Sequence, residues 1–251
     1  MGPTAFNSEV HGEHSTMCGR FTQQLTWRRI HDLYRLREPD LMVNLRPRYN
    51  GAPLQKFAAC RLDENGNRTI VGLRWGLVPS WAKDSKIAAR LINARAETVQ
   101  NKPSYGAAFR SRRCLVPANG WFEWQRTGQG KQPYFLGLPD GLPVSFAALW
   151  EHWGKNEDSL ESFTIITTVA SSELADIHDR QPAILDSDRF ADWLDPSSPL
   201  PRLLNLVREP HAGPYERYAV STKVNNVGND DPDILAPIST ATVFPRTTKL
   251  P

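Results

Sequence analysis

A segment near the N-terminus places apolar residues at close to helical spacing. These residues, within 22–38, are Leu25, Ile30, Leu33 and Leu36. The spacing predicts an amphipathic helix, with Thr22 or Thr26 as its N-cap, because a threonine hydroxyl accepts a bond from an N–H of the first turn. Pro39 is expected to end the helix, since proline cannot continue one.

Short apolar runs make up most of the remaining chain and predict strands. They lie at 56–62, 69–78, 112–126, 132–138, 143–150 and 162–169, with an extended stretch at 217–224. The Asn-Gly pair within 63–67 predicts an antiparallel hairpin between the first two runs, because Asn-Gly favours tight turns. A second Asn-Gly pair, at 119–120, divides the run at 112–126 into two strand-like halves, and residues 48–53 have the composition of a turn.

Helical patterning elsewhere is confined to short segments. Residues 96–100, 171–182 and 187–194 are expected to be helical, and Ser171 and Pro182 mark the two ends of the second segment. The chain has no internal repeat and no low-complexity linker. Short strands with a few short helices predict one α+β domain built on antiparallel strands.

The first sixteen residues differ in pattern from the rest of the chain. Residues 1–16 carry no periodic apolar pattern, so we expect a disordered leader or a misplaced start, then a domain over 17–240 and a C-terminal tail over 241–251. No apolar run approaches the roughly 18 residues of a membrane span, and the N-terminus lacks the basic and then apolar order of a secretory signal. We therefore expect a cytoplasmic protein.

The three cysteines, Cys18, Cys60 and Cys114, are widely spaced. An odd number at wide spacing does not build a disulfide framework, and no C-x-x-C pair indicates a zinc site. We expect reduced thiols, no metal or other cofactor, and a monomer.

The formal net charge of +3 permits an anionic partner without requiring one. Several arginines stand near glycine, asparagine and aromatic residues, which suits phosphate contacts with stacking between them. Ordinary surface charge is the alternative, and the spacing alone does not choose between the two. These arginines are Arg20, Arg46, Arg48, Arg74, Arg90, Arg95, Arg110, Arg112 and Arg113.

Glu123 lies within the sequence WFEW at 121–124. On a strand, alternation places Trp121 and Glu123 on one face and Phe122 and Trp124 on the other. A carboxyl that shares a face with tryptophan is expected to be partly buried, which raises its pKa and suits it to proton transfer near neutral pH. A glutamate paired with one of the many arginines is the alternative.

His178 lies near the end of the predicted short helix at 171–182 and is flanked by Asp176, Asp179 and Arg180. Helix carbonyls and carboxylates favour the charged form of histidine, so His178 is a candidate general acid or phosphate partner. A surface or capping histidine is the alternative.

Asn93 comes directly after two apolar residues and two positions before Arg95. Its amide can bind a sugar or aldehyde oxygen while the arginine holds a phosphate. An N-cap for the helix expected at 96–100 is the alternative, and both roles are compatible.

Cys18 offers different chemistry according to whether Met17 is retained. As an internal residue, it is either a core residue or a protease-type nucleophile beside His178. As the first residue, it carries an α-amine whose pKa of roughly 7.7 to 8.0 leaves much of it neutral and nucleophilic. That amine forms an imine with an aldehyde, and the thiol of the same residue then closes a thiazolidine ring, aided by proximity.

These residues lie in segments that together resemble the SOS response-associated peptidase (SRAP) family of abasic-site processing proteins. The resemblance spans about 210 residues in order, so coincidence is a poor explanation. The matching segments are MCGRF (17–21), RYNGAP (48–53), RWGLVPSWAKD (74–84), RLINARAET (90–98), RRCLVPANGWFEW (112–124), IHDRQP (177–182) and VSTKVNN (220–226).

The resemblance implies a compact domain with a curved, largely antiparallel, barrel-like sheet and flanking helices. It also implies a DNA-damage (SOS) response protein that begins at Cys18 and crosslinks to abasic sites in single-stranded DNA. By this resemblance Cys18 is the nucleophile, Asn93 orients the sugar and the new N-terminus, Glu123 shuttles protons, and His178 assists opening of the sugar.

For DNA contacts, the resemblance implies phosphate binding by Arg20, Arg95 and Arg180, a stacking surface at Trp81 and a contact at Asn50. Lyase-type chemistry is a further expectation, as is association with the nucleoid when DNA is bound. Two other functions remain open. One is a thiol peptidase that removes the residues before Cys18, and the other is a non-covalent binder of single strands.

Overall fold

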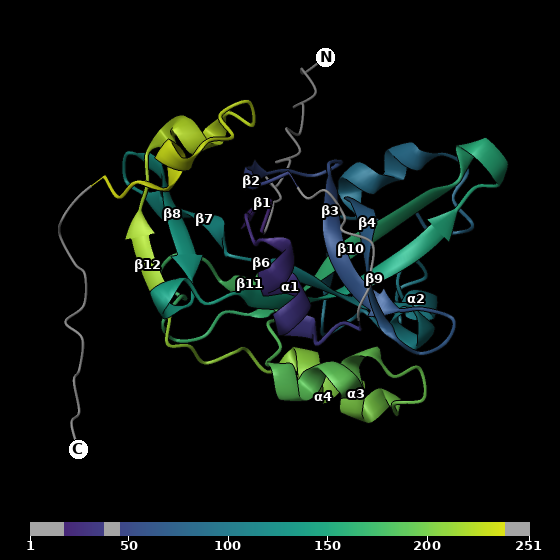
Figure 1. Ribbon diagram of the computed structural model, residues 1–251. Helices are drawn as coiled ribbons and strands as arrows, with labels where there is room; N and C mark the ends of the chain where they lie inside the picture. The colour runs from purple at the N-terminus through teal and green to yellow at the C-terminus, as the bar shows by residue number, and fades with distance from the viewer. Residues whose placement is uncertain (1–17, 38–45, 239–251) are drawn as a thin grey trace, which may run out of the picture.

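The computed structural model describes residues 18–37 and 46–238 (Figure 1). The predicted N-terminal helix is present but short, as α1 (Trp27–Tyr34), and Thr26 Oγ1 accepts a hydrogen bond from the Arg29 N–H at 3.3 Å. Residues before it form the strand β1 (Arg20–Gln23). The helix ends where Arg35 adopts a left-handed backbone (φ 50°), and Pro39 lies outside the described residues.

One of the two sheets has five strands in the order β12-β8-β7-β1-β2. Its strands besides β1 are β2 (Arg48–Gly51), β7 (Gly120–Thr127), β8 (Gly130–Gly137) and β12 (Glu216–Ala219). All four pairings in this sheet are antiparallel. Residues 48–53, expected as a turn, therefore contribute a strand, because 48–51 pair with β1.

The other sheet has seven strands, five of which close into a ring. Its strands are β3 (Lys56–Leu62), β4 (Arg68–Trp75), β5 (Asn93–Arg95), β6 (Arg113–Ala118), β9 (Val144–Trp153), β10 (Leu160–Val169) and β11 (Arg180–Pro182). β10 pairs with β4 and also with β9, so that β3, β4, β10, β9 and β6 form a barrel. The predicted hairpin at 63–67 joins β3 to β4, and the Asn-Gly pair at 119–120 marks where the chain passes from β6 to β7 in the other sheet.

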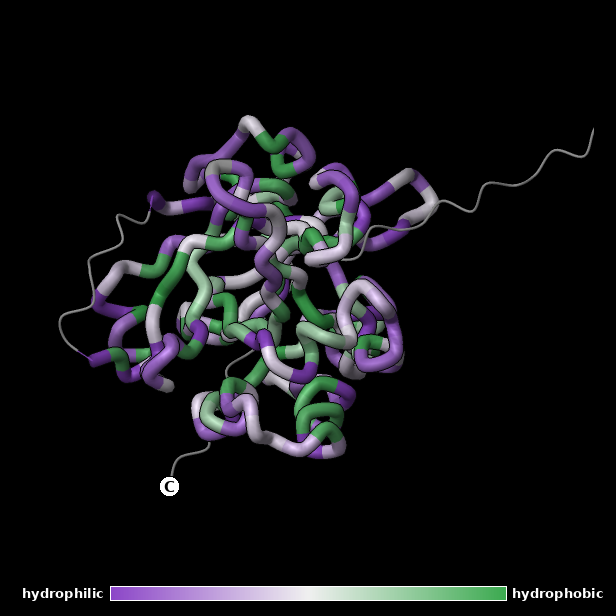
Figure 2. Tube along the Cα trace, turned by 90° about the vertical axis from the view of Figure 1, so that its right-hand side faces the viewer, coloured by the Kyte–Doolittle hydropathy of each residue, from purple (hydrophilic) through white to green (hydrophobic). Residues whose placement is uncertain are grey.

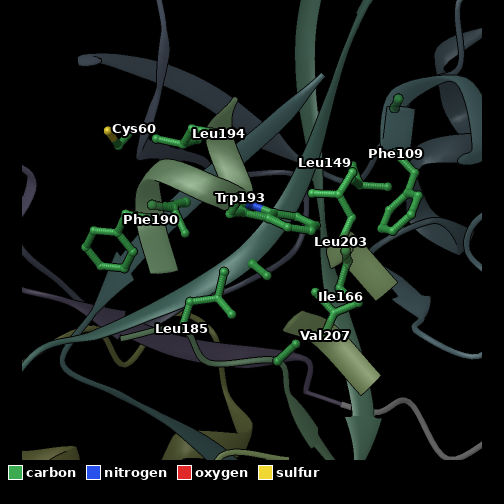
Figure 3. Close-up of a cluster of buried hydrophobic side chains, with 14 of the residues drawn as sticks. Cys60, Phe109, Leu149, Ile166, Leu185, Phe190, Trp193, Leu194, Leu203 and Val207 are labelled. Carbon is green, nitrogen blue, oxygen red and sulfur yellow. The ribbon is translucent and has the colours of Figure 1, made fainter. Parts of the chain in front are cut away.

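Hydrophobic side chains pack on both faces of the ring strands. Figure 2 shows hydrophobic segments, in green, in the interior of the molecule. Along β3, Phe57 and Ala59 face the five-stranded sheet, whereas Ala58 and Cys60 belong to a cluster under the helices. Figure 3 shows this second cluster around Trp193. Its helices besides α1 are α2 (Gly106–Ser111), α3 (Phe190–Leu194) and α4 (Leu200–Arg208). The α+β fold with a largely antiparallel, barrel-like sheet and flanking helices is thus confirmed, and β10 pairs in parallel with β4 and β5.

Two helix predictions are wrong because strand pairing takes over the backbone. Residues 96–100 form turns, and the Ala96 N–H donates to Thr167 O at 2.9 Å as a continuation of the β5–β10 pairing. Within 171–182, residues 172–177 form turns and the segment ends in β11, which pairs with β10. The helix expected at 187–194 is present as a 3-10 turn (Ser187–Arg189) followed by α3.

The expected leader (1–16) and tail (241–251) lie outside the described residues. In the part of the chain that the structure describes, no helix has the length and apolar character needed to cross a membrane.

Candidate functional site

A cleft of about 1040 Å³ opens where β7 extends past the end of β1. Its walls come from segments far apart in sequence: the start of β1, the β7–β8 hairpin, the loop before β11 and the loop after β12. The lining residues are Gly19, Arg20, Pro53, Glu123, Trp124, Arg126, Lys131, Ala175, Asp176, Ile177, His178, Asp179 and Asn225. The cleft therefore brings together three of the predicted site residues, Arg20, Glu123 and His178.

Glu123 meets Cys18 at the inner end of this cleft. The antiparallel register of β1 and β7 pairs Arg20 with Phe122, so its continuation places Gly19 opposite Glu123 and Cys18 one residue further along. The backbone N–H of Cys18 donates to Glu123 Oε1 at 2.9 Å. Glu123 is 2% exposed, and burial raises the pKa of its carboxyl to about 8 although the Cys18 N–H opposes that rise.

The predicted alternation along β7 is confirmed. Trp121 packs in the same cluster as Cys18, whereas Phe122 packs on the opposite face of the sheet with Trp124 against it. Glu123 is more deeply buried than the partial burial that the pattern predicted, and among the described residues it forms no ion pair with an arginine or lysine.

Cys18 is 1% exposed and has a left-handed backbone (φ 31°). Burial, with the Glu123 carboxyl next to it, raises the pKa of the Cys18 thiol well above its usual range. The thiol is therefore held protonated, unlike the low-pKa thiolates of cysteine nucleophiles. Because the thiol stays protonated, the site favours attack by a neutral group rather than by a thiolate.

Asn93 is the first residue of β5, so its alternative as the N-cap of a helix at 96–100 does not apply. Its Nδ2 donates to Cys18 O at 3.4 Å, and its own carbonyl accepts a 3.0 Å bond from the Tyr105 hydroxyl. Parallel pairing of Asn93 with Ile165 of β10 fixes the backbone there. Two predicted site residues thus touch Cys18 from different sheets.

His178 lies on the cleft wall opposite β7, held by the backbone that leads into β11. Its Nδ1 accepts a 3.0 Å bond from the Arg180 N–H and lies 3.1 Å from Asp179 Oδ1. Burial lowers the pKa of the imidazole, although Asp179 opposes that shift. The expectation that the surroundings favour the charged form is therefore wrong, because burial outweighs the carboxylate. With Nδ1 as an acceptor, the proton of the neutral ring lies on Nε2.

Arg20 presents an oriented cation to the cleft, and Asn50 holds it there. The guanidinium donates to Asn50 Oδ1 at 2.9 Å, to Val224 O at 2.7 Å and to Asn225 O at 3.2 Å. All three acceptors are neutral, so the charge is not compensated. Asn50 is fully buried and its amide bonds the loop carbonyls of Val224, Asn226 and Asn229, which makes it a support for Arg20.

The other predicted DNA contacts lie outside the cleft lining. Arg180 is 9% exposed, and both its terminal nitrogens bond the Glu97 carboxylate, at 2.6 and 3.0 Å. Arg95 is exposed on β5. Trp81 is 58% exposed, and its ring nitrogen lies 3.4 Å from Pro103 O. Phosphate binding by Arg180 and Arg95 and stacking on Trp81 stay predictions.

Besides Arg48, which pairs with Asp230 at 3.1 Å, and Arg110, which donates to Gly106 O at 2.9 Å, two further arginines of the sequence cluster have structural partners. Arg113 is 3% exposed, and its guanidinium bonds carbonyls at the ends of α2 and α3, including Phe109 O at 2.7 Å and Trp193 O at 2.6 Å. Arg112 pairs with Glu151 at 2.8 Å. For these two, the phosphate-contact interpretation does not fit the geometry.

Three cleft residues, Trp124, Arg126 and Lys131, were not predicted from the sequence as site residues. Alternation beyond Glu123 was the available signal, because it places Trp124 and Arg126 on one face of the strand. Gln181, which is 1% exposed, was also missed. It accepts from the Ser171 N–H at 2.8 Å and donates to the Tyr215 hydroxyl at 3.0 Å, which ties together the loop that carries His178.

Within the described ranges, no group of three or more histidine, cysteine, aspartate or glutamate side chains is arranged to hold a metal ion. The chemistry available in the cleft is that of a buried proton donor, a backbone nitrogen beside it, an imidazole and an oriented guanidinium. This set suits proton transfer to and from a nitrogen nucleophile next to an anionic substrate.

Comparison with known proteins gives consistent matches along most of the chain. The family model described as SOS response associated peptidase (SRAP) matches residues 17–227. The abasic site processing protein YoaM of Bacillus subtilis is 38% identical over 222 residues, covering 87% of this chain and 97% of the relative. The abasic site processing protein HMCES of Gallus gallus is 35% identical over 229 residues, covering 77% of this chain and 67% of the relative. A crystal structure of a protein from Bacteroides thetaiotaomicron has the same fold, with a TM-score of 0.77, 24% identity and coverage of 88% and 99% of the two chains.

Proposed function

The chain belongs to the SOS response associated peptidase (SRAP) family, and on that premise we propose that it captures abasic sites in single-stranded DNA through a covalent bond to Cys18. One contact carries the proposal, the 2.9 Å hydrogen bond between the Cys18 nitrogen and Glu123 Oε1. When Cys18 is the first residue, this nitrogen is an α-amine beside the buried Glu123 carboxyl, whose pKa burial raises to about 8 in the chain that retains its leader.

The reaction begins when the neutral α-amine of Cys18 adds to the aldehyde carbon of the ring-opened sugar. The protonated Glu123 carboxyl then donates its proton to the resulting hydroxyl, which leaves as water and yields an iminium ion. The Cys18 sulfur adds to the iminium carbon as its thiol proton passes to the Glu123 carboxylate. The product is a thiazolidine, one water has been lost, and Glu123 is protonated again.

The neighbouring residues have supporting roles in this proposal. Asn93, through its contact with Cys18 O, holds the new N-terminus toward Glu123. His178, neutral with its proton on Nε2, hydrogen-bonds through that N–H to the sugar ring oxygen and so assists ring opening, in which the ring oxygen gains a proton from water and the C1 hydroxyl loses its proton to water as the aldehyde forms. Arg20 holds a phosphate next to the abasic sugar, because its fixed guanidinium has only neutral protein partners.

The remaining predicted contacts belong to the same proposal at its periphery. Trp81, exposed and with its ring N–H 3.4 Å from Pro103 O, offers a stacking surface for a flanking base. Arg95 supplies a phosphate contact from β5. Arg180 contributes a phosphate contact only if Glu97 yields part of its bidentate pairing.

A second activity, hydrolysis of the peptide bond between Met17 and Cys18, is favoured by a separate observation. The amide nitrogen of this bond is the leaving group in hydrolysis, and it already contacts the carboxyl that could protonate it. The left-handed backbone of Cys18 adds local strain. Addition of one water would release the leader with a carboxylate and leave Cys18 with a free amine.

Intact mass spectrometry tests both activities on the protein expressed from the full reading frame. We expect a chain that begins at Cys18. After incubation with a single-stranded oligonucleotide carrying one abasic site, we expect a denaturation-resistant species whose mass equals protein plus oligonucleotide minus one water. An intact oligonucleotide of the same sequence should give no such species.

The variant Cys18→Ser separates the amine from the thiol. It keeps the α-amine but lacks the sulfur, so we expect a stable adduct only when the imine is reduced with borohydride. Cys60→Ser, with the same change at a buried cysteine away from the cleft, should still crosslink without reductant. A wild-type chain that begins at Cys18 and forms no adduct would overturn the proposal, and a chain that keeps its leader would overturn self-processing.

A further inference from the structure

The β7–β8 hairpin carries a pair of like charges directly beside the cleft. Arg126 on β7 and Lys131 on β8 are partners in the antiparallel register, both are exposed, and both line the cleft. Like charges that face each other across a strand pair destabilise it. An ordinary surface hairpin gains nothing from this arrangement, so the pair calls for an anionic partner.

The protein itself does not neutralise these two cations. Within the described residues, neither Arg126 nor Lys131 forms an ion pair with a carboxylate. Of the acidic residues in the cleft, Asp176 is already paired with Arg217, and Glu123 is buried at the inner end with the Cys18 nitrogen as its partner. Asp179 is the remaining carboxylate, and it lies next to His178.

An aromatic surface links the hairpin to the reacting end of the cleft. Trp124 lines the cleft between Glu123 and Arg126 along β7, and its ring N–H donates to Asn225 Oδ1 at 2.8 Å, which fixes the ring. Arg20, on the other side, contacts the carbonyl of the same Asn225. Cations that alternate with a fixed aromatic ring are the arrangement that tracks a single strand, through phosphates and stacked bases.

We propose that Arg126 and Lys131 bind phosphates of the single-stranded DNA on one side of the abasic site, so that the strand leaves the cleft across the β7–β8 hairpin. This inference rests on the proposed function, and it adds a path for the strand that Arg20 alone does not define. The hairpin increases the affinity for the DNA and determines on which side of the cleft the DNA strand leaves. It takes no part in bond formation at Cys18.

The turn geometry makes the hairpin a firm platform for such contacts. β7 and β8 are joined through only Gly128 and Gln129, and the Thr127 hydroxyl donates to Gly130 O at 3.1 Å. The hairpin register therefore fixes the backbone positions from which the two side chains extend. Phosphates of the DNA strand that lie beyond the hairpin should therefore add nothing to the binding affinity through Arg126 and Lys131.

The test compares the double variant Arg126→Gln/Lys131→Gln with the wild-type protein that begins at Cys18. Affinity for an undamaged single-stranded oligonucleotide is measured at several salt concentrations. Each phosphate contact to a single strand adds about 0.7 to the slope of log K against log salt, so loss of two contacts lowers the slope by about 1.4. At saturating abasic oligonucleotide, the rate of adduct formation should stay within a few-fold of wild type.

A matched control removes the same charge elsewhere. Arg189→Gln/Arg208→Gln changes two exposed arginines in the layer of helices α3 and α4, away from β7 and β8 (Figure 1). We expect its salt slope to equal that of wild type. Oligonucleotides extended only on the 5′ or only on the 3′ side of the abasic site should show the effect of the hairpin variant for one of the two and not for the other.

Several outcomes discriminate between the claims. An unchanged salt slope in the hairpin variant, a decrease equal to that of the control variant, or an equal loss with both extended oligonucleotides would overturn the strand path while the wild-type adduct still forms. Absence of an adduct with the wild-type protein would instead overturn the proposed function.

Discussion

Two glutamates in different parts of the protein are almost equally hidden from solvent but have different partners. Glu123, at the cleft, is 2% exposed, and Glu151, on β9, is 5% exposed. Glu151 receives a 2.8 Å bond from the Arg112 guanidinium and a 3.1 Å bond from the His152 N–H. Glu123 receives the Cys18 N–H, and no arginine or lysine of the described residues pairs with it.

The partner decides what a buried carboxyl can do. A carboxylate that faces a guanidinium keeps its charge and stabilises the fold as one half of an ion pair. A carboxyl without a cation resists ionisation, and the pKa of Glu123 rises to about 8 for that reason. Burial alone therefore does not mark a proton-transfer residue; burial without a cation does.

The largest expected effect comes from the same substitution at the two glutamates. Glu123→Gln keeps the shape of the side chain and removes its proton transfer, so the rate of adduct formation should fall by about 10²- to 10⁴-fold, the usual contribution of general acid–base catalysis. Glu151→Gln should leave that rate within a few-fold of wild type. Quenched time courses on denaturing gels measure both.

The contrast fails if the two variants lose activity equally. That result would mean that Glu123 acts through the fold. Circular dichroism and thermal unfolding of both variants supply the necessary control, because a rate loss counts only in a variant that remains folded.

The sequence predicted Glu123 better than it predicted Glu151, and the reason is physical. Alternation within a short aromatic strand is a local property, so the burial of Glu123 and the direction of its pKa shift could be inferred from 121–124. The pairing of Glu151 with Arg112 joins neighbouring strands and depends on register, which the sequence does not show. The same limit explains why the predicted direction of the His178 pKa shift was wrong. It also explains why the sequence predicted a phosphate contact for Arg180 and did not reveal its bidentate pairing with Glu97.

The fold shows a similar division between local and distant information. The hairpin at 63–67 and the strands on either side of 119–120 follow from local turn chemistry, and they are confirmed. The closed ring requires β10 to pair with both β4 and β9, and no short segment encodes that. β11 and the turns at 96–100 were misassigned as helices because pairing with β10 overrides their local preference.

A second prediction uses the pH dependence of stability in the chain that retains its leader. The pKa of Glu123 is about 8 in the folded protein and near the ordinary value of 4.5 when unfolded, so the folded state binds more protons between these values. The free energy of unfolding should therefore fall as pH rises from about 4.5 through about 8, by a few kcal/mol in all, since one pKa unit corresponds to about 1.4 kcal/mol.

The two glutamine variants show whether that slope belongs to Glu123. Denaturant unfolding at several pH values should give a flatter profile for Glu123→Gln over this range, whereas Glu151→Gln, which keeps Glu123, should retain the wild-type slope. In the chain that begins at Cys18, the nearby α-ammonium lowers the pKa of Glu123. The pH range over which the free energy of unfolding falls should therefore shift to lower pH. Identical profiles for wild type and Glu123→Gln would contradict the raised pKa.

The smallest expected effect concerns Arg112, the cation that pairs with Glu151. Arg112→Met leaves Glu151 buried with only a backbone donor, and we expect a loss of about 1–2 kcal/mol in the free energy of unfolding, at the low end for a broken buried pair because the Arg112 side chain is 28% exposed. The double variant Arg112→Met/Glu151→Met should recover part of that loss, since it removes the unpaired charge as well, and a double-mutant cycle from urea unfolding measures the recovery. No arginine or lysine in the described part of the chain pairs with Glu123, so Glu123→Met should need no second change to remain stable above pH 8. A double-mutant cycle that shows no coupling between Arg112 and Glu151 would mean that Glu151, like Glu123, can be buried without a cation. The two carboxyls would then differ only in their location, because Glu123 lines the cleft and Glu151 does not.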